Sequence, residues 1–466
     1  MKIVVLGAGL SGLASAALLA RAGHQVTVLE ANTWIGGKSR RIVVAGQRMD
    51  TGPALVTFPG VLEQLFDTYD SCGEPVARDI AKLELVKLKE LGRYFFREHV
   101  SDLPVKEGHP WFVPWQRFAN EHAPLTPEVT KLLTKAPTDL STLPSLAKIT
   151  SRYGLRLTTE AYVKGLKWMP EGLRELISIH TLNAGVSPKD TLALYASMTA
   201  IMAVDGISVP VGGVNEIALA LERLARHAGA DIHLGERVLR VRKKEVFTEV
   251  ADYQADAIIS SLDPQVLKHL MTGKPKQLAK KRSCSGVAIY AVLKQELPPG
   301  TVTHSVVMPD EPSELYGALH AGVPPKQTMM FVNYYRPHEI YPNEKPTVAL
   351  LLTAPADGHA YDLQSDWVKQ EINRASKLLG LDKPITELFE DYAILDPDYF
   401  AGWGAPGGAL YGATKPLWQS GPFHNPQHQN PLRPWLYRVG ASTHPGGGIP
   451  AVLGSAIITF RKIQKH

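Results

Sequence analysis

Three glycines near the start of the chain, Gly7, Gly9 and Gly12, have the spacing of a nucleotide-binding turn. Glycine permits a tight turn at Gly7, a close approach of backbone to a pyrophosphate at Gly9, and close packing of a helix on a strand at Gly12. A helix that starts at Leu10 and Ser11 offers free N–H groups and the positive end of its dipole to phosphates. The pattern therefore predicts a dinucleotide site.

The elements on both sides of this turn support the prediction. Residues 2–6 are a continuous apolar run, as a strand buried on both faces requires. Residues 13–22 are rich in Ala and Leu and predict a helix, and residues 25–29 predict a second strand. That strand ends at Glu30, whose carboxylate can accept hydrogen bonds from ribose hydroxyls. We expect a βαβ unit that places Glu30 beside the glycine turn.

A second glycine pair, Gly36-Gly37, follows Glu30 and is itself followed by Lys38. Together with the first turn, this pair resembles the extended FAD fingerprint of the amine-oxidase and phytoene-desaturase superfamily. The resemblance implies that Gly36 and Gly37 bring backbone close to the cofactor and that Lys38 neutralises phosphate charge. It favours FAD over NAD.

Two further segments resemble the same superfamily. The turn that contains Gly52 and Pro53 resembles one that borders the flavin ring in relatives. Residues 209–241 resemble the block that returns the chain to the FAD domain, in which the backbone at Val238 meets the adenine. Residues 255–260 resemble the strand that closes the same sheet.

The segment 437–456 closely resembles the terminal motif of bacterial-type carotenoid desaturases. In that family Gly440 and Ala441 reach the ribityl chain. The helix that starts at Gly448, Ile449 and Pro450 points its N-terminus at the pyrimidine edge of the flavin, where reduced flavin carries negative charge. The amine-oxidase branch usually has an acidic residue at the position of Ala441, and this difference favours a substrate other than an amine.

The resemblance implies an FAD-dependent desaturase that removes hydride equivalents from a long acyclic carotenoid, either phytoene or a later and possibly hydroxylated intermediate. A carotenoid isomerase or saturase that uses reduced FAD stays open, as do a flavin amine oxidase and a non-catalytic prenyl-protein escort. No catalytic residue is assigned. His444 could be a base, a flavin partner or a structural residue. The final electron acceptor, oxygen or a quinone, is also open.

Other partners are not expected. The cysteines Cys72 and Cys284 form no metal-binding or disulfide pattern, which fits a reduced cytoplasmic setting. Pro426 breaks any helix that could bring His424 and His428 to one metal, so no metal is predicted. Nothing indicates a nucleic-acid partner.

The length of 466 residues and 44% hydrophobic content suit two or three folded domains. We expect an α/β fold in which residues 1–57, 207–288 and 436–466 form a discontinuous, Rossmann-like FAD-binding domain. Residues 289–435 predict a substrate domain with an antiparallel sheet. Residues 58–206 predict a mostly helical region that lines the substrate cavity and contacts the membrane.

The membrane prediction rests on local charge. No segment has the pattern of a signal peptide or the roughly 20 apolar residues of a membrane span. Residues 131–170 carry seven Lys or Arg against Asp139 and Glu160, a net charge of +5. With nearby aromatics, namely Trp111, Phe112 and Trp115, this stretch predicts a docking surface for anionic lipid and hence peripheral association with the membrane. A solvated helical face is the alternative.

Overall fold

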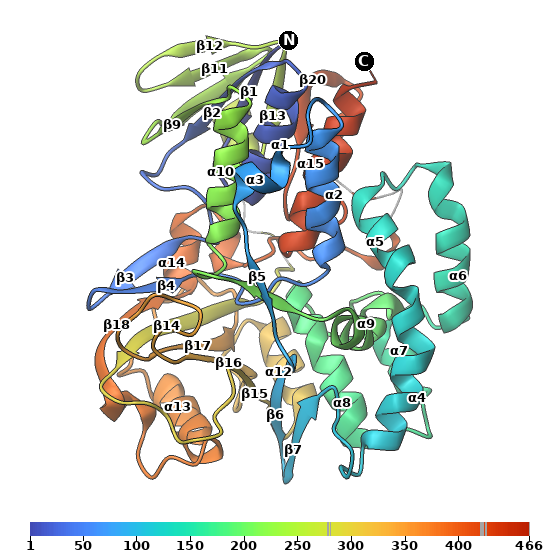
Figure 1. The fold of residues 1–466 in the computed structure, drawn as a ribbon, viewed down its shortest axis with the longest axis vertical. Helices are drawn as coiled ribbons and strands as arrows, with labels where there is room; N and C mark the ends of the chain where they lie inside the picture. Colours follow the sequence, from blue (N-terminus) through green and yellow to red (C-terminus); the bar gives the residue numbers. More distant parts are fainter. Residues whose placement is uncertain (277–278, 280, 420–423, 425, 466) are drawn as a thin grey trace.

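The computed structural model describes residues 1–466 except 277–278, 280, 420–423, 425 and 466. These positions belong to the predicted domain ranges 207–288, 289–435 and 436–466. The predictions for these positions lie outside the described residues. In Figure 1 a parallel sheet lies in the upper half, an antiparallel sheet lies in the lower half, and a group of helices stands beside both.

The upper sheet has six strands and contains the predicted βαβ unit. Parallel pairing joins all its strands except β19, which is antiparallel to β20. The strands in order are β19 (Gln429–Asn430), β20 (Arg433–Arg438), β13 (Ala257–Ser260), β1 (Lys2–Leu6), β2 (Gln25–Glu30) and β9 (Asp231–Leu234). Strands β1, β2, β9 and β13 come from the first two segments predicted for the FAD domain, and β20 extends into the third. β19 and the start of β20 lie in the range 289–435 that was predicted as the substrate domain. The boundaries of the domain stay a prediction.

Both faces of this sheet are covered. Ile3 and Val5 on one face pack with helices, and Val4 and Leu6 on the other face pack with the small antiparallel sheet and α11. The helices on the first face are α1 (Leu10–Arg21), α2 (Pro59–Asp70), α3 (Ala77–Ala81), α10 (Glu216–His227) and α15 (Ile449–Ile463). The elements on the second face are β10 (Val238–Arg242), β11 (Glu245–Thr248), β12 (Asp252–Gln254) and α11 (Pro264–Thr272). Burial on both faces explains the continuous apolar run of β1.

The lower sheet has seven strands, and α13 (Asp366–Leu378) packs on one face of it. Its strands in order are β18 (Phe389–Leu395), β14 (Ser285–Leu293), β17 (Thr347–Ala354), β16 (Met330–Tyr335), β15 (His304–Val307), β6 (Gly92–Phe96) and β7 (His99–Leu103). The predicted antiparallel sheet is confirmed, but β6 and β7 come from the range 58–206 that was predicted as mostly helical. β6 pairs antiparallel with β7, its neighbour in the sequence, and parallel with β15, which is far away in the sequence.

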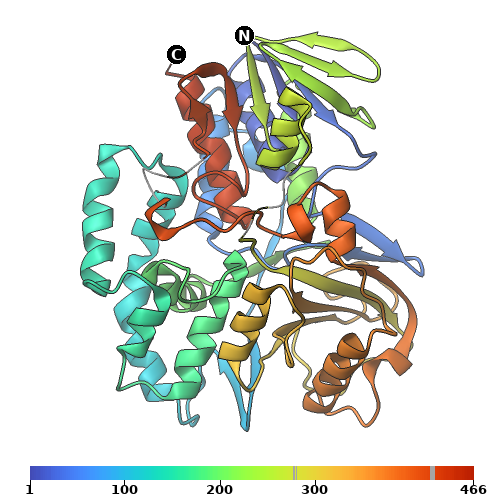
Figure 2. The same cartoon turned by 180° about the vertical axis from the view of Figure 1, so that it is seen from behind.

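A hairpin, an antiparallel pair of distant strands and several helices complete the chain. The pairs are β3 (Arg41–Val44) with β4 (Gln47–Asp50), and β5 (Leu85–Lys87) with β8 (Ser208–Pro210). The remaining α-helices are α4 (Phe112–His122), α5 (Thr126–Thr134), α6 (Leu143–Tyr153), α7 (Thr159–Lys164), α8 (Glu171–Ile179), α9 (Met198–Asp205), α12 (Pro312–Ala321) and α14 (Pro397–Gly402). Short 3-10 turns are η1 (Ala123–Leu125), η2 (Leu140–Thr142), η3 (His180–Ala184), η4 (Ala193–Ser197), η5 (Ile385–Leu388), η6 (Pro406–Gly408) and η7 (Leu417–Gln419). Figure 2 shows the same arrangement from behind, with both chain ends at the upper sheet.

The structure corrects the predicted docking surface. Trp111 and Trp115 are each only 3% exposed and belong to the core, so the prediction that they face a bilayer is wrong. The basic residues are also less available than the sequence suggested, because Lys148 pairs with Glu128 at 2.6 Å and Arg152 lies 3.7 Å from Glu121. These two acids lie outside residues 131–170 and were not counted in the net charge of +5.

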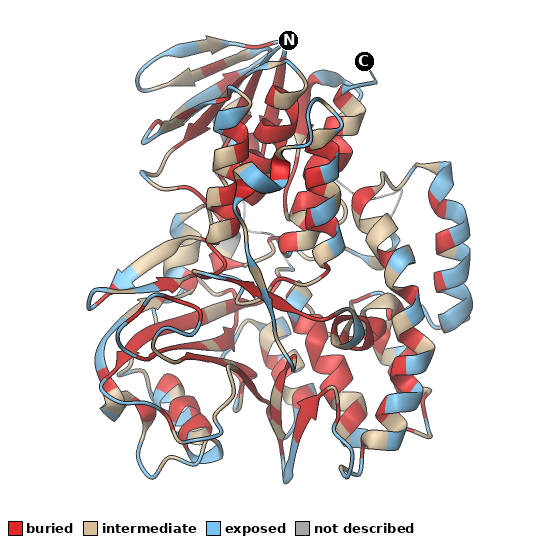
Figure 3. Ribbon diagram, viewed as in Figure 1, coloured by how far each residue is buried: buried red, intermediate tan, exposed pale blue. Residues whose placement is uncertain are grey.

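Four leucines around α6 are instead strongly exposed. Leu140 and Leu143 are 77% and 56% exposed near the start of α6, and Leu155 and Leu157 are 99% and 71% exposed just after its end. Figure 3 shows α6 as a largely exposed helix at the edge of the molecule. Within the described residues, no helix is long and apolar enough to cross a membrane.

Candidate cofactor site

The first glycine turn connects β1 to α1, and its glycines serve different purposes. Gly7 has φ +95°, and a Cβ on Gly12 would collide with the carbonyl oxygen of Gly7. Gly9 has an ordinary φ of −70°, and a Cβ on it would meet nothing within 4 Å. The protein fold therefore needs glycine at Gly7 and Gly12, whereas Gly9 leaves open space beside the backbone.

This open space lies at the N-terminus of α1. Gly9 caps the helix without a side-chain hydrogen bond, and both Leu10 and Ser11 are buried. The first N–H groups of a helix have no partner within the helix, and burying them unpaired is costly. A phosphate group satisfies such donors, so the turn fits the pyrophosphate of a dinucleotide.

Glu30 lies at the end of β2, next to this turn. Its Oε2 accepts a hydrogen bond from the Ala8 N–H at 2.8 Å, and its Oε1 accepts two from Asn32. The Glu236 N–H donates to the backbone oxygen of Glu30, which brings Val238 at the start of β10 close to the same strand end. The predicted ribose and adenine positions are thus close together.

The second glycine pair packs directly against the first turn. The Gly36 N–H donates to the Ala8 oxygen at 2.9 Å, and a Cβ on Gly37 would lie 3.2 Å from the Cα of Gly9. Both glycines have positive φ, +96° and +63°. Next to them, the Oγ of Ser39 is buried without a hydrogen-bond partner among the described residues.

Lys38 directly follows the second glycine pair and contacts a segment far away in the sequence. Its Nζ donates to the carbonyl oxygen of Leu410, its side chain is accessible, and desolvation by the surrounding protein lowers its pKa to about 8. Asp263 is the charge that opposes the shift and partly stabilises the ammonium form.

Gly52 and Pro53 follow β4 and are both exposed. The Gly52 N–H donates to the Tyr290 hydroxyl at 3.3 Å, and a Cβ on Gly52 would lie 2.5 Å from the Lys38 carbonyl oxygen. Tyr290 is on β14, so its contact with Gly52 connects the turn after β4 to the lower sheet. Sequence reasoning missed Tyr290, because a single tyrosine in a strand has no motif.

The terminal motif returns to the first turn through Gly440. A Cβ on Gly440 would lie 3.0 Å from the Oγ of Ser11, and the Gly440 N–H donates to the Oγ of Ser455 at 2.7 Å. Ala441 is partly accessible directly after it. The structure therefore places Gly440 and Ala441 beside the N-terminus of α1.

Gly448 caps α15, without a side-chain hydrogen bond, and Ile449 and Pro450 form its first positions. Gly448 is exposed, so this second helix N-terminus is also open to a ligand. His444 lies 3.2 Å from the Leu132 carbonyl oxygen through its Nε2, a contact that directs it to α5. Lys415, which the sequence did not single out, donates from Nζ to the Ser442 oxygen at 2.7 Å, and desolvation lowers its pKa to about 8.

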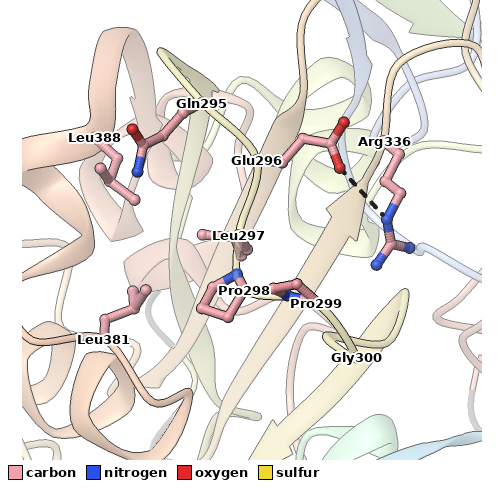
Figure 4. A pocket seen from close by; sticks show the side chains of 9 residues that line it. All are labelled: Gln295, Glu296, Leu297, Pro298, Pro299, Gly300, Arg336, Leu381 and Leu388. Carbon is pink, nitrogen blue, oxygen red and sulfur yellow. Dashed lines mark ion pairs between the residues drawn. The ribbon is translucent and has the colours of Figure 1, made fainter.

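A hollow at the surface lies apart from this site. Figure 4 shows a surface hollow formed by the connection after β14 and by residues near α13, with Arg336 and Glu296 3.7 Å apart. None of the predicted cofactor residues lines it. In the part of the chain that the structure describes, no group of His, Cys, Asp and Glu has the arrangement of a metal site.

Comparisons with known proteins agree with this geometry. Residues 10–459 match the family described as flavin containing amine oxidoreductase. The chain is 25% identical to a 4,4'-diapophytoene desaturase of Staphylococcus aureus, over 100% of this chain and 99% of the relative. It is 27% identical to a zeta-carotene-forming phytoene desaturase of Myxococcus xanthus, over 99% and 94% of the two chains.

Solved structures show the same fold at lower identity. Putrescine oxidase bound to putrescine has a TM-score of 0.66 at 15% identity, with 100% of both chains covered. A fatty acid isomerase from P. acnes that produces CLA has a TM-score of 0.59 at 16% identity, with 99% of this chain and 98% of the other covered. The two open helix N-termini, the paired glycine turns and the match over nearly the whole chain lead to one conclusion: the chain is an FAD-dependent oxidoreductase that belongs to the family of flavin-containing amine oxidoreductases.

Proposed function

We propose that this chain is a carotenoid desaturase that dehydrogenates a long acyclic carotenoid, either phytoene or a later and possibly hydroxylated intermediate. The observation that carries the proposal is the similarity to two carotenoid desaturases over nearly the full length of both chains. The family name alone does not decide the substrate. Ala441, at a position that is usually acidic in the amine-oxidase branch, supports a substrate without an amine.

The proposed cofactor contacts are those that the family resemblance implies, and the proximity of the glycine turns supports them. The N–H groups of Leu10 and Ser11 bind the pyrophosphate, Glu30 accepts the ribose hydroxyls, and Val238 meets the adenine. Gly36, Gly37 and Lys38 lie along the cofactor, and Gly52 and Pro53 border the ring. Gly440 and Ala441 meet the ribityl chain, and the α15 N-terminus at Gly448, Ile449 and Pro450 stabilises negative charge on the ring.

When bound, FAD supplies a hydride acceptor. The carotenoid loses a hydride from one carbon and a proton from its neighbour, and the electron pair of the second C–H bond forms the new double bond. The chain must therefore hold the polyene flat beside the turn at Gly52 and Pro53 and keep water away.

The lower sheet has a suitable apolar surface for this task. Phe331 pairs with Leu351 across β16 and β17, and both are partly accessible. Through the pairing of Tyr290 with Ala349, they share the sheet face of Tyr290, which contacts Gly52. A polyene on this face would lie next to the proposed position of the flavin ring.

We further propose that the four exposed leucines around α6 contact the membrane that holds the substrate. A carotenoid dissolves in the bilayer, so the enzyme must take it from there. The leucines are apolar side chains at the surface of the helical region, whereas the nearby cations Lys148 and Arg152 already have acidic partners. Peripheral membrane association at the cytoplasmic face remains a prediction.

The test is incubation of the purified protein with phytoene, lycopene or a hydroxylated acyclic carotenoid in liposomes, followed by mass spectrometry of the carotenoid. A desaturase removes two hydrogens for each new double bond. A saturase with reduced FAD adds two hydrogens, and an isomerase leaves the mass unchanged. Oxidation of putrescine or another primary amine, with no change in any carotenoid, would overturn the proposal. Supplying oxygen or a quinone in separate reactions identifies the electron acceptor.

A further inference from the structure

A buried ion pair joins β3 and β4 at the open end of their hairpin. This hairpin connects two segments of the proposed cofactor site. Arg41 and Asp50 face each other across β3 and β4, with Nε of Arg41 2.9 Å from Oδ1 of Asp50. The Asp50 side chain is 1% exposed and the Arg41 side chain 18% exposed. Gly36 and Gly37 precede this hairpin, and Gly52 and Pro53 follow it.

The same two side chains also bind the start of α10, from the second cofactor block. Asp50 accepts a hydrogen bond from the Asn215 N–H at 2.8 Å through its other oxygen. Arg41 donates to the Gly212 carbonyl oxygen at 2.6 Å and to Glu216 at 3.2 Å. Both oxygens of Asp50 and all three nitrogens of the Arg41 guanidinium are therefore occupied by protein groups.

Neighbouring contacts tighten this junction. The Asn215 side chain donates to the Ser39 oxygen at 2.9 Å, directly after Lys38. A Cβ on Gly213, which has φ +96°, would collide with Oδ2 of Asp50 and with the ring of Tyr341. Any side chain at Gly213 would thus push Asp50 away from Arg41.

We propose that Arg41 and Asp50 are positioning residues of the cofactor site, which lock the loop from Gly36 to Gly52 onto α10 and thereby hold FAD. Because protein groups occupy the polar atoms of both side chains, the pair acts by fixing the backbone of the segments that contact the cofactor. Arginine suits this role because its planar guanidinium reaches three acceptors in fixed directions. This inference rests on the proposed cofactor contacts.

The chain contains a matched control pair. Arg93 and Asp102 face each other across the hairpin of β6 and β7, with Nε of Arg93 2.8 Å from Oδ1 of Asp102. Arg93 also donates to a backbone oxygen, that of Gly300. This pair has the same hairpin geometry but lies in the lower sheet, away from the paired glycine turns.

The experiment compares Arg41→Gln with Arg93→Gln in the purified holoprotein. The rate of FAD release is followed by the fluorescence of free FAD, and thermal unfolding is followed in parallel. We expect Arg41→Gln to release FAD about tenfold faster or more. Arg93→Gln, in which Asp102 keeps Lys106 as a cationic partner, should release FAD at the wild-type rate.

Two further variants complete the test. Arg41→Lys keeps the charge but cannot reach all three acceptors, so its release rate should fall between those of the wild type and Arg41→Gln. Asp50→Asn removes the charge with little change of shape and should release FAD as fast as Arg41→Gln; it replaces that variant if Arg41→Gln does not fold. Equal release rates for the Arg41, Asp50 and Arg93 variants would overturn the positioning role. If the purified wild-type protein contained no FAD, the cofactor assignment itself would be wrong.

Discussion

Gly9 and Gly12 are both glycine, but for different physical reasons, and stability measurements can separate them. An alanine at position 9 would point its Cβ into open space with an ordinary φ, so Gly9→Ala should change the unfolding free energy of the apo form by less than about 1 kcal/mol. The same methyl group would block the approach of a pyrophosphate, so FAD affinity should fall strongly. Gly12→Ala should destabilise the apo form, because its Cβ would collide with the Gly7 oxygen.

Urea unfolding of the apo forms and FAD titration provide both quantities. If Gly9→Ala loses as much apo stability as Gly12→Ala, or keeps the wild-type FAD affinity, the assignment of the open space at Gly9 to the cofactor is wrong.

Lys38 should make FAD binding depend on pH. Desolvation lowers its pKa from 10.5 to about 8, so the apo protein loses this ammonium charge as the pH rises through about 8. FAD phosphates attract the charged form, and the affinity should therefore fall above that pH. Titration of the apo protein with FAD from pH 7 to 9 measures this effect.

Lys38→Met should bind FAD more weakly and with little pH dependence. Lys415 has a pKa lowered by the same cause to about 8 and stays in that variant as an internal control. An unchanged pH dependence in Lys38→Met would assign the effect to Lys415 instead.

At the scale of elements, α15 connects the cofactor site to the helical region through α5. A Cβ on Gly454 would collide with the Leu133 oxygen, and Arg461 donates to the Thr134 oxygen at 2.9 Å. Gly454→Ala should therefore destabilise the protein by about 1–3 kcal/mol through overpacking. Gly317→Ala, in α12, is the control, because its Cβ would meet nothing within 4 Å. Thermal unfolding of both variants tests the contact, and equal midpoints would exclude it.

The elements that the sequence predicted well are local ones. The strand, turn, helix and strand of residues 2–30 follow from a short apolar run, three glycines and an Ala-rich stretch, and the structure confirms them. The hairpin of β6 and β7 was missed although the two strands are neighbours in the sequence, whereas its attachment to the lower sheet depends on β15, which is distant. The sequence does not indicate which face of the helical region Trp111 occupies, so the prediction placed it at the surface. In the structure its ring lies so close to Gly172 that a Cβ there would collide with it.

The residues of the candidate site form the same two groups, those that a local sequence pattern indicates and those that it does not. Its glycines form recognisable patterns, because each close backbone contact excludes side chains over a short stretch. Arg41, Tyr290 and Lys415 act through contacts between distant segments, and no spacing in the sequence indicates them.

At the scale of the molecule, the leucines around α6 should dominate membrane binding. Each fully buried leucine contributes roughly 1.5–3 kcal/mol, whereas Lys148 and Arg152 already have acidic partners. Leu155→Ser/Leu157→Ser should therefore weaken co-sedimentation with liposomes more than Lys148→Glu/Arg152→Glu/Arg156→Glu does, and wild-type binding should persist at high salt.

Leu432→Ser is a suitable control, because Leu432 is 90% exposed but lies between β19 and β20 of the upper sheet. Loss of liposome binding in Leu432→Ser but not in the double leucine variant would move the docking surface to that end of the molecule.

The strand order of the upper sheet also determines when this protein can become functional during its synthesis. β1 and β2 leave the ribosome first, but β13 gains its second neighbour only when β20 has been made, and α15 follows later still. Until then the nascent chain has an unpaired edge at β13 and exposes the apolar residues that α15 covers, a state that favours association with other chains. The cofactor site is therefore complete only once α15 has been made, and we expect the chain to retain FAD only from that point.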